Sequence, residues 1–171
     1  MQEVFESSEL VEIVGIPLIL LNKLIERGQY GIQANVRAGD GRGSRRLFSD
    51  RDLFGIALIW WLYEAGLRTK VIQFVLNQIC GGKLRSRASD AAGFLNKGKH
   101  EFLLVDRASR TEVKKGATHP LQRVVLADRE QTIGQIKQLG TRTMLALPIR
   151  ELYSRLKDEL DQRQVNSAKR G

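Results

Sequence analysis

The stretch that decides the fold runs from Glu9 to Gly28 and reads ELVEIVGIPLILLNKLIERG. Apolar residues at helical spacing over 10–14 predict a short amphipathic helix, and Gly15 marks its end because glycine tolerates the positive φ of a helix stop. Pro17 suits the start of a second helix, running to about Arg27, since its missing N–H would be unpaired there. Two helices joined by such a short turn can place the second in a DNA major groove, although an ordinary helical hairpin in a core has the same outline.

A basic, glycine-rich segment follows from Val36 to Leu53 and reads VRAGDGRGSRRLFSDRDL. Its glycines permit a tight reversal, and five arginines lie on or beside it: Arg37, Arg42, Arg45, Arg46 and Arg51. Guanidinium groups suit phosphate oxygens, so a hairpin of this kind could straddle a DNA backbone. A solvated, flexible loop is the alternative. Ser49 and Asp52 then form a capping box, which predicts that a third helix begins here.

Residues 9–79 of the 171 resemble the DNA-binding domain of MerR-type transcriptional regulators. That family combines a helix-turn-helix, a basic wing and a second helical pair. The most specific likeness is to its wing-to-helix signature Y-R-L-Y-S-x-x-D-L, matched here by Arg46, Leu47, Phe48, Ser49, Asp52 and Leu53. Further family positions are matched by Glu9, Leu10, Gly15, Gly28, Gly66 and Leu67. The resemblance implies that Arg46 binds backbone phosphate.

The second helix departs from the family's usual S-x-x-T-L-R-Y-Y. Asn22 and Lys23 stand where an arginine and a tyrosine are usual. Lysine can still meet a phosphate, and asparagine can pair bidentately with adenine, whereas the apolar Ile19 and Leu20 offer mainly contact with thymine methyl groups. We therefore expect weak sequence specificity, or a face that binds protein instead. The candidate DNA-binding residues are Pro17, Leu18, Ile19, Asn22, Lys23, Arg37, Arg42, Arg45 and Arg46.

The third predicted helix is apolar all round. Leu53 to Tyr63 reads LFGIALIWWLY, so more than one side should be covered, by the C-terminal part of the chain or by a second subunit. It is shorter than the roughly 20 apolar residues that cross a bilayer. Trp60 and Trp61 are expected to pack in the core. A fourth helix is predicted over Thr69 to Ile79, where apolar residues recur at helical spacing.

Beyond residue 80 the pattern changes. Residues 81–99 are rich in glycine, serine and positive charge, which predicts a linker. Strands are predicted over 101–106, 121–127 and 143–147, with 111–115 as a partner for the first, and a short helix over 132–139. A last helix, opened by Pro148 and running to about Arg163, carries one apolar stripe. We expect it to cover the small sheet, with subunit contact as the alternative.

The predicted fold is therefore mainly α with an α+β C-terminal part. A winged helix-turn-helix over residues 1–80 would be followed by the linker over 81–99. A small domain with a three- to four-stranded sheet and helices would occupy 100–165, where it could serve dimerisation or bind an effector or partner. Residues 166–171 would form a disordered tail. The family's long coiled-coil helix is not expected after Ile79, because Gly81 and Gly82 interrupt it.

Composition narrows the functional classes. A net charge of +9 and a pI near 10.1 favour a polyanionic partner, and residues 80–129 form a second basic region. The single cysteine, Cys80, excludes an internal disulfide, and it lacks the neighbours of a metal site. His100 and His119 are interpreted as surface residues. The amino terminus has no apolar signal region, so a cytoplasmic protein is expected.

Three functional hypotheses follow. The first is a transcriptional regulator of the MerR-like type that binds double-stranded DNA, acts as a homodimer without cofactor or membrane, and contacts RNA polymerase or another protein. The second is a protein-binding or assembly module that keeps the fold without reading DNA. The third, an enzyme, has no support, since the sequence offers neither a phosphate-cradling glycine motif nor a nucleophile–base pair.

Overall fold

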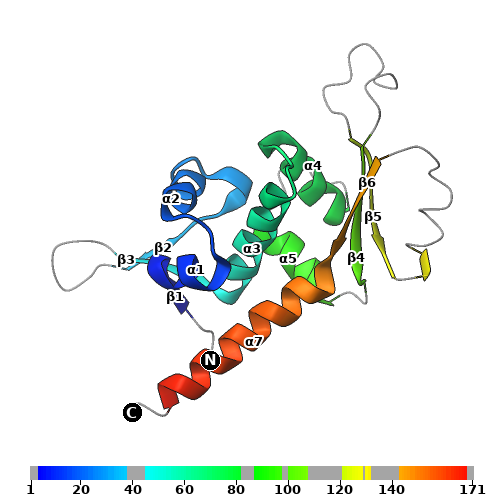
Figure 1. Ribbon diagram of the computed structural model, residues 1–171. Helices are drawn as coiled ribbons and strands as arrows, with labels where there is room; N and C mark the ends of the chain where they lie inside the picture. The colour runs from blue at the N-terminus through cyan, green and yellow to red at the C-terminus, as the bar shows by residue number, and fades with distance from the viewer. Residues whose placement is uncertain are drawn as a thin grey trace.

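The computed structural model describes residues 4–37, 45–81, 87–97, 100–107, 121–128, 130–131 and 143–168. Within these residues the chain is mainly helical, with two small antiparallel sheets. Figure 1 shows helix α3 near the centre, with α1, α2 and the first sheet on one side and α4, α5 and the second sheet on the other. This arrangement leaves α2 at the periphery of the molecule.

The first helical pair forms as the sequence predicts. Helix α1 spans Ser7–Val14 and α2 spans Leu18–Glu26. Gly15 between them has φ 75°, in the left-handed region, and its N–H donates to the Val11 carbonyl at 2.9 Å. Pro17 lies just before α2, where its carbonyl accepts from the first turn, so the helix begins one residue later than expected.

The first sheet has the order β1-β3-β2, with β1 at Val4–Glu6, β2 at Asn35–Arg37 and β3 at Arg45–Ser49. Strand β1 was not predicted from the sequence. It pairs antiparallel with β3, where Phe5 lies opposite Phe48 and both side chains are buried. The start of the described chain is thereby fixed beside the segment that leads into α3.

Helices α3 (Asp50–Glu64) and α4 (Thr69–Ile79) confirm the predicted second pair. The capping box is present: the Ser49 N–H donates to Asp52 Oδ2 at 3.1 Å, and the Asp52 N–H donates to Ser49 Oγ at 3.4 Å. Buried residues lie all round α3, as its apolar sequence predicts, and Trp60 and Trp61 pack partly buried against the core.

The expectation of a linker over 81–99 is wrong for its central part. Residues Ala88–Lys97 form helix α5, whose buried side chains are mostly alanines. Small residues let α5 approach α3 closely, because a Cβ built on Gly55 of α3 would lie 2.8 Å from the Ala88 backbone. Glycine and alanine are therefore packing residues here, although their small side chains make the helical pattern of apolar residues in 81–99 hard to recognise.

The second sheet has β4 (Phe102–Arg107) between β5 (Leu121–Ala127) and β6 (Thr143–Pro148), all antiparallel. The three predicted strands are confirmed, apart from small differences at their ends. The fourth candidate strand at 111–115 and the helix expected at 132–139 lie outside the described residues, as does His119. Helix α4 packs against this sheet through β5.

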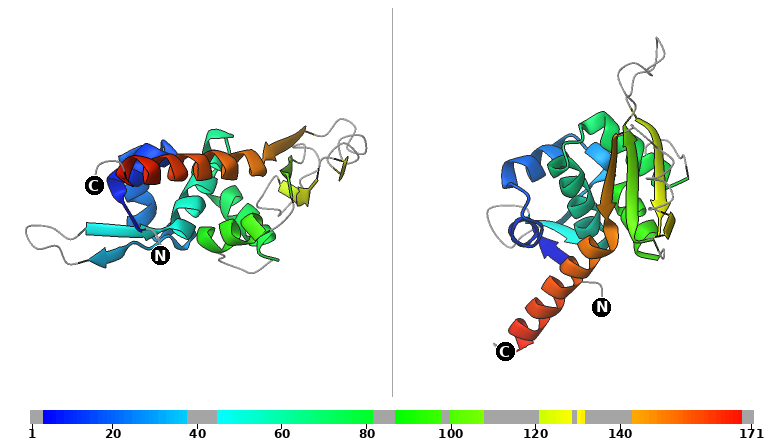
Figure 2. Two further views of the ribbon diagram at one scale, coloured as in Figure 1. Left: turned by 90° about the horizontal axis from the view of Figure 1, so that it is seen from below. Right: turned by 45° about the vertical axis from the view of Figure 1, so that its right-hand side comes forward.

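The last helix, α7, spans Ile149–Ala168 and does not serve mainly as a cover for the sheet. It leaves β6 directly, contacts β4, and then runs past α3 to α1, as both views in Figure 2 show. It therefore supplies the C-terminal cover that the apolar α3 requires. The expectation of a disordered tail is wrong for residues 166–168, which are helical, and 169–171 lie outside the described chain.

One hydrophobic core joins both halves of the sequence. It contains Phe5 and Phe48 from the first sheet, α3 side chains, and Leu103 and Leu147 from the second sheet. Residues from Phe5 to Ile149 are thus buried in the same cluster.

Candidate nucleic-acid interface

Helix α2 divides into a buried and an exposed face. Leu21 and Leu24 are almost fully buried and fix the helix against the core. On the other side Pro17 and Lys23 are exposed, and Leu18 and Ile19 keep 49% and 72% of their surface accessible. Leu18 and Ile19 thus form a small exposed apolar area on one helix turn.

The β2–β3 pair lies beside this helix in the fold. Its backbone register pairs Val36 with Arg46 and Arg37 with Arg45. The predicted DNA-binding residue Arg42 lies outside the described residues. The described backbone therefore shows antiparallel pairing of the strands on either side of the predicted hairpin.

A hydrogen bond joins the hairpin base to α2. Arg46 Nη1 donates to Asn22 Oδ1 at 3.0 Å, across 24 residues of sequence. Both side chains are half-buried, so the bond is partly shielded from water. Both residues are among the predicted DNA-binding candidates, but their pairing was not predicted, because nothing in a single sequence indicates a contact at this separation.

A second polar cluster fixes the end of α2. Tyr30 donates to the Thr69 carbonyl at 3.3 Å and lies 3.3 Å from the Tyr63 hydroxyl, which in turn lies 2.8 Å from Thr69 Oγ1. Burial, together with the Tyr63 hydrogen bond, raises the pKa of Tyr30, so this phenol stays neutral. The backbone of Tyr30 has φ 58°, a left-handed conformation that non-glycine residues rarely adopt. No local pattern in the sequence indicates this cluster, because its residues are brought together from two separate segments of the chain.

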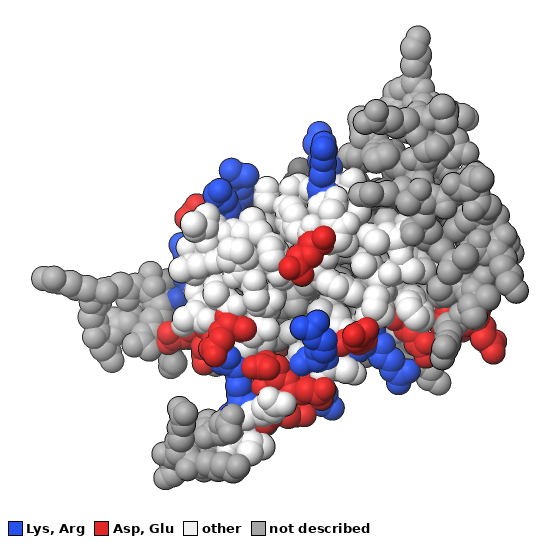
Figure 3. Space-filling view, viewed as in Figure 1, with Lys and Arg blue, Asp and Glu red and all other residues white. Residues whose placement is uncertain are grey.

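The charges visible on one face are mixed. In Figure 3, basic side chains stand singly over the upper edge near α2 and α4, while acidic and basic residues intermix along the lower edge near α1 and α7. Among the described residues of that face there is no continuous basic patch. The candidate interface thus consists of the exposed part of α2 and the hairpin base.

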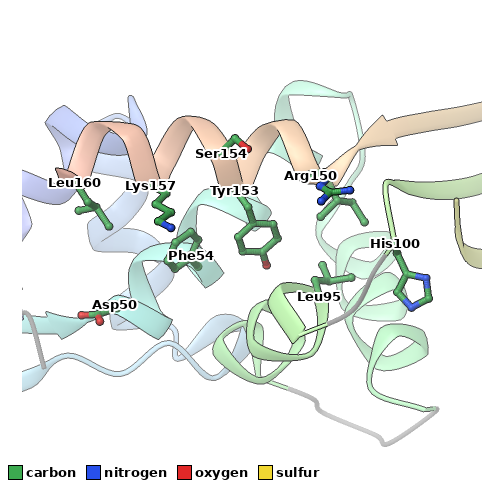
Figure 4. Close-up of a pocket in the computed structure, with 10 residues that line it drawn as sticks. Asp50, Phe54, Leu95, His100, Arg150, Tyr153, Ser154, Lys157 and Leu160 are labelled. Atoms are coloured by element: carbon green, nitrogen blue, oxygen red, sulfur yellow. The ribbon is translucent and has the colours of Figure 1, made fainter. Parts of the chain in front are cut away.

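A hollow of about 780 Å³ lies elsewhere, beneath α7. Figure 4 shows Tyr153 and Lys157 of α7 above Phe54 of α3, with His100 and Arg150 toward the opposite end. Phe54 and Tyr153 stack with ring centroids 5.0 Å apart, and Tyr153 donates to the Ala92 carbonyl at 2.9 Å. These contacts hold α7 to α3 and α5. The half-buried His100 lines this groove rather than the α2 surface.

No group of three or more His, Cys, Asp or Glu that could hold a metal ion occurs among the described residues. In the same part of the chain, no helix combines the length and the apolar character needed to cross a membrane. Cys80 is a half-buried free thiol at the end of α4.

Comparison with known proteins found no family model that matches this chain and no significantly similar curated protein. A functional conclusion therefore has to come from the chain's own residues and their geometry.

Proposed function

We propose that this protein binds double-stranded DNA as a MerR-like regulator of transcription, with α2 in the major groove and the β2–β3 hairpin serving as a wing on the adjacent phosphate backbone. The observation that carries the proposal is the junction between the two elements. Arg46 of β3 is hydrogen bonded to Asn22 on α2, beside the exposed residues of that helix. A groove-reading helix and a backbone-gripping segment need such a fixed relation, since phosphate contacts set the register of base contacts.

The charge of the protein supports the same partner. A net charge of +9 favours association with a polyanion, and lysine on the exposed side of α2 can meet phosphate. On this proposal Lys23 and Arg46 contact the backbone, while Asn22 and the aliphatic Leu18 and Ile19 face the base edges. A homodimer would read two half-sites about one helical turn apart and could then position RNA polymerase.

Duplex-DNA binding at several salt concentrations tests this proposal. We expect affinity to fall steeply with salt, and Lys23→Gln to reduce the slope of log affinity against log salt by about 1, as the loss of one phosphate contact does. Lys97→Gln on α5 is the matched control, because it removes the same charge from an exposed helical site away from α2. It should leave the slope unchanged if its side chain takes no part in binding.

Two results would contradict DNA binding at α2. One is a native protein that does not bind duplex DNA even at low salt. The other is an equal effect of both lysine substitutions, which would mean that only net charge matters. The symmetry of a selected motif would also decide between a monomer and a dimer, because a two-fold dimer selects a palindrome.

A protein-binding module is the second candidate, and the exposure of Leu18 and Ile19 favours it. Apolar contact is what a protein partner would use, and a groove-facing helix rarely needs two adjacent aliphatic residues. A double substitution, Leu18→Ser with Ile19→Ser, separates the candidates. It should abolish partner binding if this module is correct, whereas salt-dependent DNA binding through phosphate contacts should largely survive it.

A further inference from the structure

The hydrogen bond between Arg46 and Asn22 fixes the orientation of an amide. A guanidinium group has only donors, so the atom of Asn22 that faces it must be the acceptor Oδ1. The amide is planar, with its oxygen and nitrogen on opposite sides of the terminal carbon. The Asn22 NH₂ group is therefore turned away from Arg46. Within the described residues, Arg46 is the hydrogen-bond partner found for this side chain.

Asn22 is half-buried and lies next to the exposed residues of α2. It follows Leu18 by four residues and Ile19 by three, which puts all three side chains on neighbouring positions of one helix face. A groove that receives Leu18 and Ile19 would thus also meet the amide of Asn22. What Asn22 offers there is a pair of N–H donors, because its oxygen is engaged by Arg46.

Donors and acceptors on base edges decide what such an amide can read. In the major groove, guanine presents two acceptors, O6 and N7, and thymine presents the acceptor O4. Adenine presents its acceptor N7 beside an amino donor, and cytosine presents an amino donor, so a side chain that offers only N–H donors meets a like donor on both of these bases. Bidentate pairing of asparagine with adenine requires the amide oxygen to accept from the adenine amino group. An oxygen held by a charge-assisted bond to arginine is less available for that purpose.

We propose, on the basis of the DNA-binding function above, that Arg46 is a positioning residue that orients Asn22 to read a keto base, guanine or thymine, rather than adenine. Arg46 keeps further guanidinium donors for a phosphate oxygen. One side chain then links backbone contact to base readout, and docking of the hairpin on the phosphate fixes the amide in its reading orientation. The exposed methyl groups of Leu18 and Ile19 are suited to thymine beside it.

Selection of binding sites from a random duplex pool tests this proposal with the full-length protein and two variants. Asn22→Asp keeps the size of the side chain and an oxygen for Arg46 but replaces the NH₂ donors with an acceptor. We expect one motif position to change from guanine or thymine to adenine or cytosine, with a change in relative affinity of about tenfold. Arg46→Ala frees the amide, so the same position should gain adenine.

Lys23→Gln is the control for readout, because it should weaken binding to all sequences without changing the preference at any position. Thermal denaturation of each variant verifies that the fold persists. A native preference for adenine at the position altered by Asn22→Asp, or a motif that neither substitution changes, would overturn the keto-base inference while DNA binding itself stands. Failure of the native protein to bind any duplex DNA would overturn both proposals.

Discussion

Tyr153 illustrates at the residue scale how one side chain ties the C-terminal helix to the rest of the protein. Its ring stacks on Phe54 of α3, and its hydroxyl donates to the Ala92 carbonyl of α5 at 2.9 Å. Burial raises the pKa of Tyr153, because a phenolate in this setting would lose its hydration. Burial likewise raises the pKa of Tyr30.

Raised tyrosine pKa values predict how stability depends on pH. The folded protein holds these protons more tightly than the unfolded chain, whose tyrosines titrate near 10.0. The stability that comes from keeping these two tyrosines protonated is thus fully present below pH 10 and is lost as the pH rises above 10. Tyr153→Phe should lower the free energy of unfolding at pH 7 by about 1 kcal/mol, because one hydrogen bond is lost. It should also make the fall in stability above pH 10 less steep, because phenylalanine has no proton to lose.

Urea unfolding from pH 7 to pH 11 measures both effects. Ser154→Ala, at an exposed neighbouring position of α7, is the control. It should show the native dependence of stability on pH, with a small constant offset from the higher helix propensity of alanine. An alkaline loss of stability that is as steep in Tyr153→Phe as in the native protein would show that the Tyr153 proton is not held by the fold.

At the element scale, two glycines within helices have opposite roles. Gly55 lies in α3 where it meets α5, and a Cβ there would come within 2.8 Å of the backbone at Ala88 and Ser89. Gly93 lies in α5 with no atom within 4 Å of an added Cβ. Backbone atoms cannot move aside as the end of a flexible side chain can, so only Gly55 is required for packing.

The same substitution should therefore change stability in opposite directions. Gly93→Ala should raise the free energy of unfolding by about 0.5–1 kcal/mol, since alanine loses less conformational entropy in a helix. Gly55→Ala has the same entropic advantage, but its added methyl group forces α3 and α5 apart. The variant should therefore be destabilised overall by about 1–3 kcal/mol. Chemical denaturation of the two variants provides the test. Equal stability changes would mean that the α3–α5 contact is not as close as described.

Element by element, the sequence was most informative where a local rule applies. The stop at Gly15 and the capping box of Ser49 and Asp52 were predicted because backbone conformation and neighbouring residues determine them. Helix α5 was missed because its packing surface consists of alanines, whose value depends on Gly55 in another helix. Strand β1 was missed because only pairing with β3 makes three residues a strand.

For the whole molecule, the important feature is a core shared by both sheets. Leu103 and Leu147 of the second sheet belong to the same buried cluster as the helices around α3. Helix α7 adds a connection between the two ends of the chain, because Arg163 Nη2 lies 2.9 Å from Glu12 Oε2 on α1. Glu12 is 73% exposed, so this ion pair contributes little, and the apolar contacts carry most of the stability.

A shared core predicts one cooperative unfolding transition. Fluorescence of Trp60 and Trp61 reports on α3, whereas far-ultraviolet circular dichroism reports on all elements, and the two curves should coincide. Leu103→Ala in the second sheet should lower the midpoint seen by both probes, at a cost of about 2–5 kcal/mol. Two separate unfolding transitions would contradict a single core. So would an unfolding midpoint, followed by tryptophan fluorescence, that Leu103→Ala leaves unchanged.

The sequence by itself determined the local features: the helical pair around Gly15, the capped α3, the helix over Thr69–Ile79 and the three strands of the second sheet. Each follows from interactions between residues that are close in the chain. Tertiary structure decided that α7, one of the two covers expected for α3, packs on α3 and α1. It alone decided that alanines make α5 a packing helix and that Arg46 holds the amide of Asn22. These are contacts between distant residues, and one sequence does not specify which distant surfaces meet.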